Sequence, residues 1–369
     1  VTPPNMYHPI LPVYDEETKK CVFSCNPIIR KTFASPILKV AISQGYIVTK
    51  IYRADRYKLS ESKWKGLLGS MYKMKYYSSS NGDKTLPYET VEENHQRHYH
   101  FYKNNFDIEL DFSQCRKRPA LKLSSKVLIN SPWGKHAESV DHTQSKVLHY
   151  EDSINSEEFL YQIEKRQVKV KQITTLTQER TLFKYDERRQ WNDKIVRPNL
   201  HKGYLPCAVF VPMYGQLMTW DILNQVGERA LMCDTDSVKY ISNGIDTDIQ
   251  ASDCLGEWED EGNLIEFVSI GLKSYGLRYE DGKPDSFKLK GCCLKRSHKN
   301  QINFETMKDM LFDSRKISIP QLSFDYTMGE GIKTRQYLKM VKFDKSILKG
   351  DYDEDSTILY PFNYQKIIL

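Results

Sequence analysis

The chain has 369 residues, more than one ordinary hydrophobic core holds, so two or three packed subdomains are expected. Its 54 Lys and Arg against 48 Asp and Glu leave a net charge of +6, which permits a polyanionic partner without requiring one. No apolar run reaches the length of a membrane span and no signal segment opens the chain, so no membrane partner is expected.

Apolar alternation in the first part of the chain predicts short strands at 10–13, 21–23 and 45–52 around a helix at Ile37–Gln44. Helical spacing follows at Ser60–Tyr77 and at Val91–Asp111, with the polar loop Ser78–Asp83 between them. These elements predict an α+β fold.

Pro119 opens a strong predicted helix, because proline suits the first helical position. Residues Glu138–Asn199 form a charged, irregular block that we interpret as an inserted subdomain. From Ala208 the chain becomes helical and apolar until Gly227, and a strand at Arg229–Met232 follows. Beyond Lys299, the pattern predicts a helix at Phe304–Leu311 and then a β-rich stretch.

Asp234-Thr235-Asp236-Ser237 lies between short apolar runs, which predicts a β-hairpin. On a strand, residues two apart share a face, so Asp234 and Asp236 are expected side by side, where they would attract a hard cation such as Mg²⁺. Two other interpretations remain open for this motif alone. It resembles a solvated turn, and glycosyltransferases hold a metal-nucleotide on a similar Asp-x-Asp pair.

The helix from Pro119 carries Lys126, Asn130, Trp133 and Gly134 at spacings that place them near one another. An ammonium, an amide and an indole beside a glycine suit a nucleoside triphosphate. The alternative is an ordinary helix C-terminus, where Lys, Asn and Gly are common.

Eight cysteines lack the regular spacing of a secreted disulfide framework, so reduced thiols in an intracellular compartment are expected, with nucleus or cytoplasm left open. Cys21 and Cys25 could form half of a zinc site, and His95, His98 and His100 could supply ligands. No second cysteine pair completes a four-ligand set, so structural or solvated roles are preferred.

Lys126-x-x-x-Asn130-Ser131-x-Trp133-Gly134, followed by Asp234-Thr235-Asp236-Ser237, resembles motifs B and C of family B DNA polymerases. Lys273-Ser274-Tyr275 resembles the Lys-x-Tyr motif by which these enzymes hold the primer end, and Lys288-Leu289-Lys290-Gly291 resembles a further basic segment. Segments near both ends, 4–9 and 360–362, make the whole pattern similar to the protein-primed subgroup of adenoviruses, linear plasmids and Polinton-type elements.

The resemblance implies a right-hand polymerase with an antiparallel palm sheet, helical fingers, a small thumb and an inserted subdomain. It implies these divisions: 1–115, part of the palm with an inserted subdomain; 116–137, the fingers helix; 138–199, a second insertion; 200–290, palm with motif C and Lys-x-Tyr; 291–369, thumb.

The resemblance also implies roles for single residues in DNA-directed DNA synthesis with two Mg²⁺ ions, for which Mn²⁺ could substitute. Asp236 would be a direct metal ligand, and Asp234 would add negative potential or hold a ligand water. The implied nucleotide-binding residues are Lys126, Asn130, Trp133 and Gly134. The implied primer-binding and DNA-binding residues are Thr235, Ser237, Lys273, Tyr275, Lys288 and Lys290. The implied partners are a DNA template-primer, dNTPs and a terminal protein that supplies the first priming hydroxyl.

The chain departs from the family pattern at motif A, because 1–4 contain no carboxylate and Asn5–Pro9 match only the end of that motif. Cys233, Pro132 and Trp133 are smaller departures. We therefore expect the chain to be the C-terminal part of a longer viral or selfish-element polymerase. The alternatives are a nucleic-acid-binding remnant without catalysis and a glycosyltransferase, although the latter has no need of Lys126 or of Lys273-x-Tyr275.

Overall fold

A computed structural model describes most of the chain, and every structural statement below concerns the part that it describes. The described residues are 1–16, 19–57, 64–79, 89–137, 143–149, 151, 153–165, 168–187, 190–191, 194–195, 204–244, 249, 251–294, 298, 301–327, 331–345, 348–356 and 358–366.

The protein is a mixed α+β chain that divides into two compact units. The first unit contains Val1–Trp133, Val209–Ile317 and Val341–Leu369, and the second contains Gly134–Ala208 and Ser318–Met340. The predicted insertion at 138–199 thus falls within the second unit. That unit also takes in 318–340, which the sequence had grouped with the thumb.

The core at the start of the first unit is built on two helices, α1 (Ser35–Ser43) and α6 (Leu205–Val226). Its buried members include Ile10, Ala41 and Trp220. The Trp220 indole donates a hydrogen bond to the His8 carbonyl at 2.8 Å. The N-terminal segment is therefore fixed along α6, next to the hairpin β1 (Pro12–Asp15) and β2 (Lys20–Phe23).

A second core joins α2 (Lys65–Ser79) to α3 (Val91–Phe106) through the buried rings of Tyr72, Tyr76 and Tyr102. Helix α3 begins with a capping box, in which the Thr90 hydroxyl accepts from the Glu93 amide and the Glu93 carboxylate accepts from the Thr90 amide. Two free backbone donors at the helix start are satisfied in this way.

Helix α4 (Pro119–His136) follows a 3-10 turn, η2 (Phe112–Gln114). The backbone amides of Arg116 and Arg118 donate to the carbonyls of Tyr77 and Ser78, so the start of α4 is tied to the end of α2. Only Ser125 of α4 is buried, and most of the helix surface is open.

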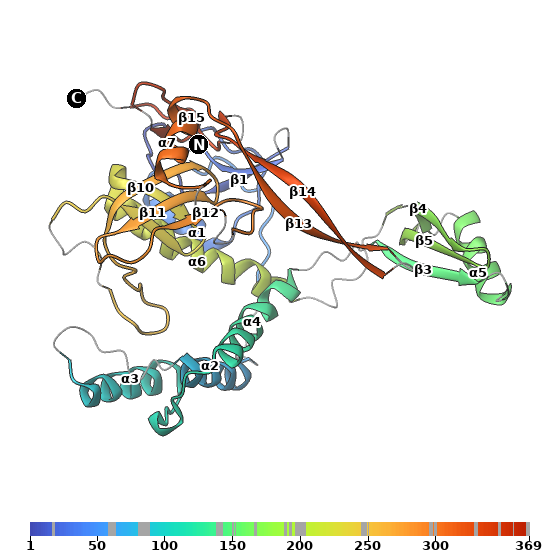
Figure 1. Ribbon diagram of the computed structural model, residues 1–369, viewed down its shortest axis with the longest axis horizontal. Coiled ribbons are helices and arrows are strands. Elements are labelled where there is room, and N and C mark those ends of the chain that lie inside the picture. Colours follow the sequence, from blue (N-terminus) through green and yellow to red (C-terminus); the bar gives the residue numbers. More distant parts are fainter. Residues whose placement is uncertain are drawn as a thin grey trace. The chain divides into compact units, whose positions relative to one another are not determined.

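Antiparallel strands complete the first unit (Figure 1). They are a hairpin, β8 (Ala230–Asp234) with β9 (Ser237–Tyr240), and a three-stranded sheet of β10 (Leu264–Gly271), β11 (Ser274–Tyr279) and β12 (Ser286–Lys288). Helix α7 (Phe304–Phe312) packs on this sheet through Phe304, whose ring lies 5.2 Å from that of Phe287. A short pair, β15 (Asp351–Tyr352) with β16 (Leu359–Tyr360), lies near the C-terminus.

The second unit has its own small core, in which α5 (Ser153–Glu164) packs on the sheet of β3 (Gln144–His149), β5 (Arg180–Glu187) and β4 (Val168–Thr177) (Figure 1). Phe159 of α5 is fully buried against Leu148, Val168 and Tyr185. The remaining strands are two hairpins: β6 (Gln190–Trp191) with β7 (Lys194–Ile195), and β13 (Ile317–Thr327) with β14 (Gly331–Val341).

The structure confirms the predicted helices, with ends shifted by a few residues. Gly227 does end α6, and its φ of +56° opens the 3-10 turn η4 (Gly227–Arg229) that leads into β8. The strand predicted at 45–52 is wrong, because 46–57 contain no regular element. The predicted loop at 78–83 lies mostly outside the described residues. No helix in the described part of the chain is long and apolar enough to cross a bilayer.

Candidate functional site

The Asp234–Ser237 segment forms the tip of the β8–β9 hairpin. Asp234 ends β8 and pairs with Ser237, so Thr235 and Asp236 make a two-residue turn. Thr235 adopts the left-handed conformation with φ of +59°, and the Thr219 hydroxyl of α6 donates to its carbonyl at 3.0 Å. Asp236 therefore lies in the turn, where strand alternation does not relate it to Asp234.

A second hairpin tip, between β10 and β11, contacts the first. Lys273 lies at this tip with φ of +55°, and its Nζ is 2.5 Å from Asp234 Oδ1. The Lys273 side chain is 62% exposed and that of Asp234 is 26% exposed, so the ion pair is open to solvent. The structure thus brings together two residues that the sequence had placed in separate motifs.

Tyr275 and Lys288 lie on neighbouring strands of the same sheet, paired in register. The Lys288 ammonium is 5.5 Å from the centre of the Tyr275 ring. Contacts with Tyr275 first, and then the fields of Glu261 and Asp234, raise the pKa of Lys288 above its usual value. Lys290 follows, and its backbone amide donates to the Ser274 hydroxyl at 3.1 Å.

Asp234 carries a negative charge that its surroundings stabilise. The hydrogen bond from Lys273 is the largest cause that lowers its pKa, and Thr235 and Lys288 add to the effect. Asp236 is exposed at the turn. The tip therefore presents one carboxylate held by lysines and one open to solvent.

The N-terminal segment reaches the base of the same hairpin. The His8 ring lies with Nε2 2.9 Å from the Gly227 carbonyl oxygen, and burial lowers the pKa of this histidine. Gln216 of α6 donates to the Ile10 carbonyl at 2.7 Å. The segment that resembles the end of motif A is thus fixed beside the chain that enters β8.

On α4, Lys126 and Asn130 are exposed, and Trp133 is 37% exposed. A side chain added at Gly134 would meet no atom within 4 Å, so the surface there is open. These four predicted residues share one helix, as expected.

Lys75 of α2 is a functional candidate that sequence reasoning missed. Burial is the largest cause that lowers the pKa of Lys75, and the positive charges of Lys126 and Lys122 lower it further. The three ammonium groups therefore form a lysine cluster, defined here as Lys75, Lys122 and Lys126. Lys122 could have been found, because it precedes Lys126 by four positions, but nothing in the sequence indicates Lys75.

The lysine cluster favours an anion. A phosphate would offset the positive charges of Lys126 and Lys122 that lower the pKa of Lys75. No ion pair between described residues joins a carboxylate to any of the three.

The hairpin tip offers Mg²⁺ two carboxylates and no third protein ligand among the described residues. Mg²⁺ is commonly bound by one or two carboxylates together with substrate phosphates, and Asp236 and Asp234 offer two carboxylates. Within the described residues, the tip is not part of any group of three metal-ligating side chains.

The possible zinc ligands named from the sequence are mostly apart. Cys21 is exposed, whereas the buried Cys25 donates from Sγ to the Met6 carbonyl at 3.4 Å. His95 stacks on Phe112 with ring centres 4.0 Å apart, and His100 is exposed. Only His98 lies in a cluster of metal-ligating groups.

Some basic residues expected in the thumb, at 295, 296 and 299, lie outside the described residues. Comparisons with known proteins add no family, since no family profile, curated protein or solved structure matches the chain.

Proposed function

We propose that the chain is part of a DNA-directed DNA polymerase, a nucleotidyltransferase that adds dNTPs to a primer on a template. The observation that carries the proposal is the contact between Lys273 and Asp234. Their two motifs are distant in sequence, and each resembles a polymerase motif. A polymerase needs these motifs at one place, because the primer end must meet the metal-binding carboxylates.

In this proposal, the primer 3′-hydroxyl attacks the α-phosphate of a dNTP and pyrophosphate leaves. Lys273 and Tyr275 position the primer end, and Lys288 and Lys290 bind the phosphates behind it, together with the backbone around Thr235 and Ser237. Asp236 and Asp234 would hold Mg²⁺, which would supply charge neutralisation at the phosphates.

The lysine cluster supports the nucleotide side of the proposal. Lys126 and Lys122 extend from α4 and Lys75 from α2, so a triphosphate bound there would be neutralised from two helices. Asn130 and Trp133 lie further along α4 and would line the sugar and base. Gly134 would leave room for the templating pair.

The second candidate is a nucleic-acid-binding remnant of such a polymerase. One observation favours it: no group of three metal-ligating side chains includes Asp234 or Asp236 among the described residues. In either case, the proposed partner is primed DNA. Protein priming of a viral or selfish linear DNA, with a terminal protein, is the finer proposal.

The test is dNTP incorporation on a primed template with Mg²⁺, using this chain and a form extended upstream in its natural gene to the nearest aspartate. The variants are Asp236→Asn and Lys126→Gln. Asp281→Asn is a matched control, because Asp281 is also an exposed aspartate in a turn, but at the opposite end of β11.

We expect incorporation that Asp236→Asn abolishes, that Lys126→Gln weakens through a higher KM for dNTP, and that Asp281→Asn leaves unchanged. Salt-sensitive DNA binding without incorporation by either form would establish the remnant. Equal activity of Asp236→Asn and the unaltered chain would contradict the assigned site.

A further inference from the structure

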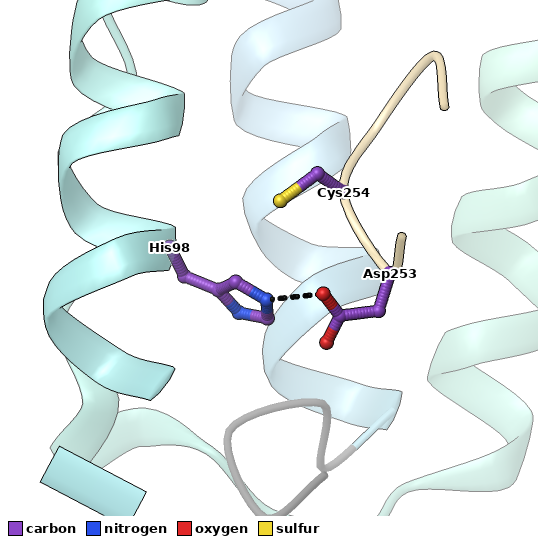
Figure 2. Close-up of side chains that lie close together, drawn as sticks. All are labelled: His98, Asp253 and Cys254. Carbon is purple, nitrogen blue, oxygen red and sulfur yellow. Dashed lines mark ion pairs between the residues drawn. The ribbon is translucent and has the colours of Figure 1, made fainter. Parts of the chain in front are cut away.

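Helix α3 and the segment after β9 meet in a buried polar cluster formed by His98, Asp253 and Cys254 (Figure 2). The donor atoms of these three side chains all lie within 4.8 Å of one another. Around a zinc ion with bonds of roughly 2.0–2.3 Å, the donor atoms lie closer to one another than this. A small movement of the side chains would therefore bring all three donor atoms to bonding distance of one ion.

One ring nitrogen of His98 is held by a hydrogen bond, and the other is left to face the cluster, as in a metal-binding histidine. Its ring is fully buried, and its Nδ1 is hydrogen-bonded to the Tyr76 hydroxyl. The Tyr76 ring is itself buried, in the core between α2 and α3. Histidines that bind metal through one ring nitrogen usually make such a bond with the other.

The second ring nitrogen of His98 points into the cluster. Nε2 lies 3.0 Å from Asp253 Oδ1, yet the two atoms do not meet the geometry of a hydrogen bond. Figure 2 shows the ring edge directed at the carboxylate. A ring nitrogen without a hydrogen bond, facing a carboxylate in a buried place, is the arrangement that a shared cation explains.

The charges around the cluster are consistent with a cation. The Asp253 side chain is only 15% exposed and accepts a hydrogen bond from Arg97 Nη1, so a carboxylate faces the His98 ring inside the cluster. Asn94, one turn before His98 on α3, also has a buried side-chain oxygen without a hydrogen bond. Buried polar groups left in this way usually mark a water or an ion.

Arg97 is the one group that could take the place of a metal. Its Nη1 donates to Asp253 Oδ1 at 2.9 Å and to Cys254 Sγ at 3.4 Å. However, Glu89 holds the same guanidinium from its other side, at 2.8 and 3.0 Å. Arg97 is therefore anchored by Glu89 and can remain a donor to the two negative ligands when a metal binds.

We propose that His98, Asp253 and Cys254 bind one zinc ion that joins α3 to the segment 251–258. Nitrogen, oxygen and sulfur donors together suit zinc, and a fourth, non-protein ligand completes the tetrahedron. Cys254 binds as thiolate, so its proton is released to solvent. Zinc bound here would stabilise the fold, because the three ligands come together only when α3 and 251–258 are in contact.

The first test is cobalt binding to the full chain, after removal of metal with a chelator. We expect one Co²⁺ per chain, a thiolate-to-cobalt charge-transfer band in the near ultraviolet, and loss of that band when zinc is added. A chain that binds no cobalt or zinc, or a spectrum without the thiolate band, would overturn the proposal. This measurement needs no variant.

The second test compares zinc affinities by competition with a chromophoric chelator. His98→Gln and Cys254→Ser should each weaken zinc binding by more than about tenfold. Replacing a residue that only hydrogen-bonds to a ligand already weakens binding by about tenfold or more, and these two residues are ligands themselves. Cys21→Ser and His100→Gln are matched controls, because both residues are exposed. Zinc affinity lost in Cys21→Ser and kept in Cys254→Ser would assign the metal elsewhere and reject this site.

Discussion

The ion pair between Asp234 and Lys273 makes a clear residue-scale prediction about pH. Lys273 lowers the pKa of Asp234, so the pair contributes stability above the unfolded pKa of about 3.9 and loses it as pH falls through the lower folded pKa. Lys273→Met should raise the pKa of Asp234, as measured by carboxyl NMR titration. The loss of stability should be small, because the pair is open to solvent. Lys283→Met breaks another exposed pair and should leave Asp234 unchanged.

The capping box of α3 is a residue-scale feature whose contribution to stability can be measured. Thr90→Ala removes the hydroxyl that accepts from the Glu93 amide, so the free energy of unfolding should fall by about 1 kcal/mol. Urea denaturation measures the change. Thr49→Ala serves as control, because Thr49 is exposed in an irregular segment. An unchanged midpoint for Thr90→Ala would show that the cap is not formed in solution.

At the scale of elements, the sheet of β10, β11 and β12 depends on Gly276. A Cβ at this position would lie 2.8 Å from Phe287 and 3.1 Å from Val268. Phe287 cannot move freely, since its ring packs on the buried Phe304. Gly276→Ala should therefore destabilise the protein by about 1–3 kcal/mol, measured by thermal unfolding.

The strain from Gly276→Ala should also reach the proposed site, because Gly276 adjoins Tyr275 and pairs opposite Phe287, next to Lys288. Gly282→Ala lies in the turn beyond β11 with open space around it, so it tests the backbone cost alone at its φ of +74°. Equal effects of both variants would remove the packing explanation.

At the scale of the whole molecule, a net charge of +6 gives only a mild attraction to nucleic acid, so the proposal relies on local lysines. Binding to primed DNA should weaken with salt, and Lys288→Gln should reduce the slope of log affinity against log salt by about one. Fluorescence anisotropy at several salt concentrations measures the slope. Lys283→Gln, an equal loss of charge, should change it less.

The sequence predicted most of the helices because their signals are local, but α5 was missed within the block at 138–199 that was interpreted as irregular. Pro119 and Gly227 mark a helix start and a helix end through their own backbone chemistry, and apolar spacing marks the buried faces. The strand expected at 45–52 failed for the opposite reason. A strand needs a partner to satisfy its backbone, and alternation alone does not show whether a partner is present.

The candidate site was partly predictable. The aspartate pair, Lys126 and the Lys273-x-Tyr275 motif stand out by residue type and spacing. Lys75 and the partners of His98 do not. Asp253 contacts both His98 and Arg97, yet it lies 156 positions from Arg97, so these residues meet only after folding. Spacing along the chain therefore indicated possible ligands on α3 but not the segment that meets them.

The docking of Leu255 on the Tyr102 hydroxyl has a consequence for the order of folding, because this contact spans 153 positions. Helices α2 and α3 are close in sequence, so their pairing has low contact order and can form early. Arg97, His98 and Tyr102 of α3 contact residues 253–255. These contacts can form only after the long stretch of chain between them has closed into a loop. Amide exchange on α3 should therefore become slow in two stages during refolding, the second coinciding with protection of the β8–β9 hairpin.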